Sequence, residues 1–150
     1  MLADENRNKT QMEFSDTTLF DWAGNERLRY CSEEALYRTS FQLGDTLANK
    51  QYILDLGELH GAVEVKVNTE WVGDCIIPPF RLDISEQISP GFNTIEIWLI
   101  SSLKNRLVGR ALEGDDRYER FLQYDSSLKV NGLKGPVLIW EVDKKSELIN

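Results

Sequence analysis

The sequence predicts an all-β protein, an antiparallel β-sandwich with one short helical turn. Apolar and polar residues alternate at 62–67, 80–84 and 95–99, as in strands that bury one face. Seven or eight such short segments follow one another, separated by turn residues at intervals of about ten. The 150 residues have the usual length of one domain and contain no internal repeat.

The N-terminal part divides into a polar lead-in and an aromatic segment. Residues 1–12 are polar without periodicity, so we expect a flexible lead-in or linker remnant, followed by one sandwich domain over 13–150. Aromatic residues between turn residues predict a loop-rich strand at 13–30 whose rings mostly join the core. These residues are Phe14, Phe20, Trp22 and Tyr30.

Further strands are expected at 35–43, 52–56 and 61–67. In the first, Tyr37, Thr39, Phe41 and Leu43 alternate with polar neighbours, and in the third, Val63, Val65 and Val67 are predicted to face the same way. The turn that follows holds Asn68 and Thr69, where a two-residue hairpin needs positive φ at both positions. Because a β-branched residue is strained there, we expect a longer loop through Glu70 or Thr69 at negative φ.

The second half of the chain predicts a sheet crossing, a central strand, a helical turn and a closing strand. Pro78-Pro79 cannot donate to a ladder and indicate an edge or a corner between sheets. The segment 94–101 is the clearest strand, with Ile95, Ile97 and Leu99 inward. Asp116 and Glu119 are spaced like a capping pair and predict a short helix within 110–124. The apolar segment 136–142 predicts a closing strand covered on both faces.

Charge and composition exclude several classes of partner. With 25 acidic and 17 basic residues the chain repels phosphate backbones and anionic lipids, so no nucleic acid is expected. Its apolar runs are far shorter than the roughly 20 residues that span a bilayer, so no membrane is expected. Cys31 and Cys75 are too few to indicate a disulfide framework.

No catalytic constellation is recognisable, so we do not expect an enzyme. His60 is the single histidine, and no Ser or Cys stands in a nucleophile elbow. Glu64, Asp83 and Glu96 have outward parity beside basic residues, which favours a solvated ion-pair lattice over hydrolytic carboxylates. No cofactor is expected. A structural calcium ion at Asp115-Asp116 is left open, although a helix cap is the favoured interpretation.

The order of short motifs along the chain is similar to that of a known family. LDLG at 54–57, VKVN at 65–68, PPFRLDI at 78–84, PGFNTIEI at 90–97, NRLVG at 105–109 and GLKGPVLIWEV at 132–142 follow one another. This order resembles the galactose-binding-like jelly roll, an accessory domain of family 2 glycoside hydrolases and of rhamnosidase-type enzymes. Thr69, where the family usually has Gly, and Cys31-Ser32-Glu33 depart from the pattern.

The resemblance implies a non-catalytic carbohydrate-binding or accessory module of a larger polysaccharide-degrading glycoside hydrolase. In such enzymes the catalytic carboxylates lie on a separate domain, and the expected partner is a glycan or that catalytic domain. A parent enzyme of this kind is expected in the periplasm or outside a bacterium. The alternative is a purely structural scaffold between domains, without a sugar site.

Sugar recognition requires an aromatic face and polar side chains that converge on hydroxyl groups. The residues that meet this requirement are Trp98, Trp71, Asn105, Arg106, Arg117 and Tyr118. Trp98 has outward parity, and we favour its being covered by the long segment 110–131 over its being a sugar platform. Trp71 is either a rim aromatic or packed over the sheet edge. For Arg106 we favour pinning a loop to a backbone carbonyl over binding a sugar.

Overall fold

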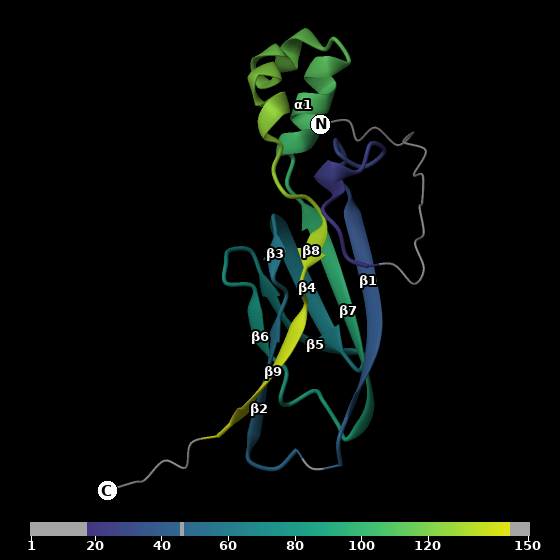
Figure 1. Ribbon diagram of the computed structural model, residues 1–150, viewed down its shortest axis with the longest axis vertical. Helices are drawn as coiled ribbons and strands as arrows, with labels where there is room; N and C mark the ends of the chain where they lie inside the picture. Colours follow the sequence, from purple (N-terminus) through teal and green to yellow (C-terminus); the bar gives the residue numbers. More distant parts are fainter. Residues whose placement is uncertain (1–17, 46, 145–150) are drawn as a thin grey trace, which may run out of the picture.

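Two antiparallel sheets pack face to face in the computed structural model, which describes residues 18–45 and 47–144 (Figure 1). Sheet A has the strand order β1 (Glu34–Leu43), β7 (Gly91–Ser101), β4 (Gly61–Val67) and β5 (Glu70–Cys75). Sheet B has the order β6 (Arg81–Asp83), β2 (Lys50–Asp55) and β9 (Leu138–Asp143). A third pair joins β3 (Glu58–Leu59) to β8 (Leu133–Gly135). The predicted all-β sandwich is confirmed, whereas the lead-in at 1–12 and Phe14 lie outside the described residues.

The core forms between the inner faces of the two sheets. The inward residues predicted for 61–67 and 95–99 are all buried, and they meet Tyr52, Leu54, Leu56 and Ile84. On β1, Tyr37, Phe41 and Leu43 pack partly against this core, but Thr39 is exposed. The reason is that β1 is the edge strand of a four-stranded sheet whose partner has three strands.

The chain crosses from sheet A to sheet B at Pro78-Pro79, which lie between β5 and β6, as predicted. The aromatic segment before β1 differs from its prediction, because the described residues of 13–30 form turns and the one-turn 3-10 helix η1 (Trp22–Gly24) instead of a strand. Of its rings, Trp22 is buried and Tyr30 half-buried. Both cysteines are free thiols.

Helical structure gathers at one end of the sandwich, the top of Figure 1. The helix α1 (Lys104–Leu112) follows β7 and packs against η2 (Asp116–Ser127), a 3-10 helix. The helix predicted within 110–124 is thus confirmed in type but is longer, and its N-cap is Asp115, which accepts a hydrogen bond from the Arg117 N–H. Among the described residues, no helix has the length and apolarity that crossing a membrane requires.

The closing strand β9 is not covered on both faces, contrary to prediction. Ile139 packs against the core, whereas Leu138, Trp140 and Val142 are 41%, 51% and 46% exposed. Two facts explain this: β9 is an edge strand, and the outward face of sheet B meets solvent. The three exposed side chains form what we call the β9 stripe.

The turn between β4 and β5 is a two-residue hairpin that holds Thr69 at φ 71° and Asn68 at φ 51°, so the prediction of negative φ or a longer loop is wrong. Asn68 fixes this geometry because its side chain donates to the Gln87 carbonyl and to Asn93 Oδ1, each at 2.8 Å. Its Oδ1 also accepts from the Thr94 N–H at 2.9 Å. These bonds hold the turn in the left-handed region despite the β-branched residue.

Replacing Thr69 with Gly is expected to stabilise the protein by about 0.5–1 kcal/mol, because Gly removes a left-handed penalty of about 1–2 kcal/mol at some entropic cost. Urea unfolding followed by fluorescence measures the change. The matched control, Thr39→Gly in the extended β1, is expected to destabilise by a similar amount. A Thr69→Gly protein no more stable than the parent would contradict the strain.

Candidate functional site

The outward face of sheet A carries a groove of about 380 Å³, here called the Trp98 groove. Its lining consists of Glu34, Ala62, Val63, Glu64, Lys66, Asp74, Ile76, Trp98, Leu99 and Ile100. The register explains the grouping, since Trp98 pairs with Glu64 on β4, and Glu64 pairs with Asp74 on β5. Because Ile97 and Leu99 are buried in the core, Trp98 must point to the other side of the sheet.

Trp98 lies open in this groove, with 40% of its surface exposed. The prediction that the segment 110–131 covers Trp98 is wrong. That segment forms the last turn of α1 and then η2, which lie at one end of the sandwich (Figure 1). None of its residues lines the groove. The α1 helix leads the chain away from the sheet face, and the indole is left accessible.

Trp71 lies on the same face of sheet A, one row further along, and is 58% exposed. A β-bulge between Val65 and Lys66 shifts the register so that Lys66 pairs with Trp71 and Val72 packs against the core. Without this shift Trp71 would have inward parity. The two indoles belong to strands separated by β4, about 10 Å across the sheet.

Charged groups surround the two indoles, and several have no partner. Within residues 18–45 and 47–144, no hydrogen bond or ion pair uses the side chains of Glu34, Glu64, Lys66 or Asp74. Glu96, by contrast, accepts a 2.7 Å charged hydrogen bond from Arg38 on β1. The predicted ion-pair lattice therefore holds for Glu96 and not for Glu64. Free carboxylates and an ammonium group beside an indole can hydrogen-bond a polyhydroxylated ligand.

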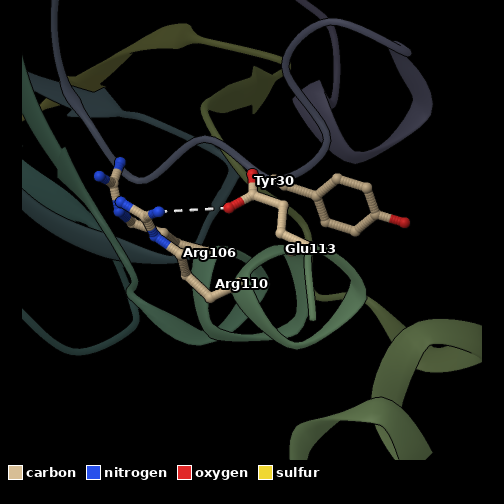
Figure 2. A pocket seen from close by; sticks show the side chains of 5 residues that line it. Tyr30, Arg106, Arg110 and Glu113 are labelled. Atoms are coloured by element: carbon tan, nitrogen blue, oxygen red, sulfur yellow. Dashed lines mark hydrogen bonds and ion pairs between the residues drawn. The ribbon is translucent and has the colours of Figure 1, made fainter. Parts of the chain in front are cut away.

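A second, smaller hollow of about 160 Å³ lies beside α1, lined by Tyr30, Arg106, Gly109, Arg110 and Glu113 (Figure 2). Its two guanidinium groups are already paired. Arg106 Nη1 donates to Glu33 Oε1 at 2.7 Å, and Arg110 Nη1 donates to Glu113 Oε2 at 3.2 Å. Arg106 thus pins a carboxylate on the segment before β1, in place of the backbone carbonyl that we expected.

Tyr30 closes the side of this hollow. A Cβ on Gly109 would lie 2.7 Å from the Tyr30 Cβ, so only glycine allows α1 to approach so closely. The Tyr30 hydroxyl donates to Asp125 Oδ1 at 2.7 Å, and this hydrogen bond raises the pKa of the phenol. The hollow therefore holds neutralised charges and a neutral phenol, and it has a structural part in joining α1 to its neighbours.

Asn105 has no surface to offer a ligand, because it is 2% exposed. Its Nδ2 donates to the Lys129 carbonyl at 2.8 Å, and its Oδ1 accepts from the Lys129 N–H at 2.9 Å. The nitrogen and the oxygen of the side-chain amide are thus both used to hold the segment after η2 against α1. The sugar-binding prediction for Asn105 conflicts with this burial.

Arg117 and Tyr118 lie on η2, outside the groove. The Arg117 guanidinium forms a bidentate ion pair with Asp115, from Nε to Oδ1 at 2.9 Å and from Nη2 to Oδ2 at 2.7 Å. It also lies 5.6 Å from the centre of the Tyr118 ring. The hydrogen bonds from Arg117 lower the pKa of Asp115. Asp115 serves as the favoured helix cap, and within the described residues no three His, Cys, Asp or Glu side chains group as metal ligands.

The structure therefore brings together two of the six predicted site residues, Trp98 and Trp71, and separates them from the other four. It adds three groove residues that were not predicted as ligands, Glu64, Lys66 and Asp74. Outward parity was the available signal for Glu64 and Lys66, and it was interpreted as an ion-pair lattice. Asp74 gave no signal, because its place depends on the β4–β5 register.

No protein-family profile matches the chain. A curated protein of Formosa agariphila named "Putative beta-glucuronidase" is 32% identical over 101 residues, which are 66% of this chain and 9% of that protein. The solved structure of a rhamnosidase from Novosphingobium sp. PP1Y superposes with a TM-score of 0.70 at 30% identity, over 83% of this chain and 12% of that one.

The chain thus spans about a tenth of the length of these relatives. The predicted resemblance to an accessory domain of glycoside hydrolases is confirmed. The part of the rhamnosidase on which this chain superposes has the same fold over 83% of the chain.

Replacing Asn105 with Ala is expected to lower the free energy of unfolding by about 2 kcal/mol, because the Lys129 backbone loses both partners. Arg106→Ala, the neighbouring control, removes one partly exposed ion pair and should cost less than about 1 kcal/mol. Urea unfolding measures both. Equal costs for the two variants would show that the Asn105 amide has no special part.

Proposed function

We propose that this chain is a non-catalytic module of a larger glycoside hydrolase and that it binds a glycan on the outward face of sheet A. One observation carries the proposal: Trp98 and Trp71 are exposed on the same sheet face, with unpaired polar side chains between them. The similarity to one domain of long enzymes named as a rhamnosidase and a glucuronidase supplies the glycan as the class of ligand.

The groove has the composition that a pyranose requires. An indole face packs against the C–H face of a sugar ring, while carboxylates and amines bind the hydroxyls at its edge. Glu64 and Lys66 stand on the strand between the two tryptophans, so they are placed to contact hydroxyls of a sugar that rests on either indole. The volume of about 380 Å³ lies within the range of small-ligand sites.

A binding role is favoured over hydrolysis because of the setting of the acids. A glycosidase needs one carboxyl group whose proton is held at neutral pH by an apolar, desolvated surrounding. Glu34, Glu64 and Asp74 are all exposed side chains. They lack that surrounding and are suited to hydrogen-bond a glycan.

Trp98→Ala is expected to weaken glycan binding about tenfold, as the loss of one aromatic platform implies, and Trp71→Ala to weaken it less. Affinity electrophoresis against rhamnose-rich and galactose-rich polysaccharides measures the change. Trp140→Ala is the matched control, because this indole lies on the opposite sheet and its exposure, 51%, falls between those of Trp98 and Trp71. The proposed groove is contradicted if Trp98→Ala leaves the affinity unchanged. It is also contradicted if Trp140→Ala lowers the affinity as much as Trp98→Ala does.

A second candidate function, a scaffold between domains, is favoured by the β9 stripe. Its three apolar side chains are adjacent on one face, and no described strand pairs with the outer edge of β9. The Tyr52 N–H donates to Ser85 Oγ and the Tyr52 carbonyl accepts from the Ile84 N–H, so both groups point away from β9. Tyr52 and Glu141 therefore form a non-hydrogen-bonded pair, and the N–H and C=O of Glu141 point away from β2, toward the outer edge of β9. An apolar face next to an unpaired edge is suited to packing against a protein surface.

The occupant that we propose for the β9 stripe is another domain of the same polypeptide, because the relatives hold about nine tenths of their length outside this domain. Hydroxyl-radical footprinting compares the 150-residue chain with the full polypeptide. Trp140 is expected to become several-fold less reactive in the full polypeptide while Trp71 stays reactive. Equal reactivity of Trp140 in both contradicts the scaffold function.

A further inference from the structure

We infer that the Trp98 groove discriminates by charge, accepting neutral glycans and rejecting glycans that carry uronate groups. The inference rests on the proposed function, since it names the class of ligand for the same groove. It follows from the signs and the pairing of the charged side chains, and not from their residue types alone.

The lining of the groove is unbalanced in charge. It contains the carboxylates of Glu34, Glu64 and Asp74 and a single ammonium group, that of Lys66. The field of the whole chain has the same sign, because its formal net charge is −8. A carboxylate on the ligand would therefore meet a surface that repels it.

Within the described part of the chain, the lining of the groove holds one cation, the unpaired ammonium group of Lys66, and no arginine. Recognition of a carboxylate generally uses an arginine fork or an unpaired lysine. The Arg38 guanidinium, on the next row of the same face, is held at 2.7 Å by Glu96. Lys66 pairs in register with that same Glu96 on β7 and has Glu64 two residues away on its own strand, so its charge is offset by carboxylates on both sides.

The repulsion acts at the place where the sugar rests. Trp98 and Glu64 are direct cross-strand neighbours, whose Cβ atoms lie about 5 Å apart, and Asp74 is the next residue across the sheet. A sugar stacked on the indole thus lies within a Debye length of both carboxylates, which is about 10 Å at 0.1 M salt and longer at lower ionic strength. The same two carboxylates accept hydrogen bonds from neutral hydroxyl groups, so they attract one class of glycan and repel the other.

The experiment compares two forms of one backbone, an oligogalacturonate and its methyl ester, by calorimetry at low ionic strength. The ester is expected to bind about tenfold more tightly than the free acid, and added salt should narrow the difference, because it screens the charges. The double variant Glu64→Gln, Asp74→Asn should also reduce the difference in affinity between the ester and the free acid. The control Glu26→Gln, Glu86→Gln removes the same charge from exposed positions outside the groove and should leave the preference in place.

The outcomes distinguish a failure of charge selection from a failure of glycan binding. Equal or tighter binding of the free acid overturns the charge selection while leaving glycan binding intact. A preference that survives in the Glu64→Gln, Asp74→Asn protein, or disappears in the control, also overturns it. If neither form binds and Trp98→Ala changes nothing, the proposed function fails, and the selection fails with it.

Discussion

The burial of alternate side chains on β7 and β4 is the constraint on which the rest of this molecule depends. Ile97 and Leu99 on one strand and Val63 and Val65 on the other are at most 3% exposed and meet Leu54 from the opposite sheet. A slip of one residue would expose all of them, so the register is fixed by the hydrophobic effect. The same register that buries these residues places Trp98, Glu64 and Lys66 on the opposite face.

Buried asparagines hold the loops that connect these strands. Asn93 is fully buried, and its Nδ2 donates to the carbonyls of Ser89 and Gly91 while its Oδ1 accepts from the Ser89 N–H and from Asn68. At the other end of the sandwich, the Asn105 side chain binds the backbone N–H and C=O of Lys129 in the same way. A buried amide that lost these partners would lower the free energy of unfolding. The two asparagines therefore fix the conformation of the loops at both ends of the sandwich.

The sandwich has two outward faces that point in opposite directions, and they differ in chemistry. The Trp98 groove on sheet A combines indoles with unpaired charges, whereas the β9 stripe on sheet B is apolar and borders an open strand edge. This difference underlies the two functions proposed above. It would allow one small domain to contact a glycan on one side and the body of an enzyme on the other.

The sequence by itself determined the central strands at 61–67 and 94–101 and their inward faces, because a period of two is a local property of consecutive residues. It did not determine what covers an outward face, as Trp98 and Trp140 demonstrate, since that depends on segments far away in the chain. Only the tertiary structure placed 110–131 at the end of the sandwich and directed Trp71 outward through the bulge at Val65 and Lys66. Thr69 is a similar case, because the side-chain bonds of Asn68 to Gln87 and Asn93 override the local preference against positive φ.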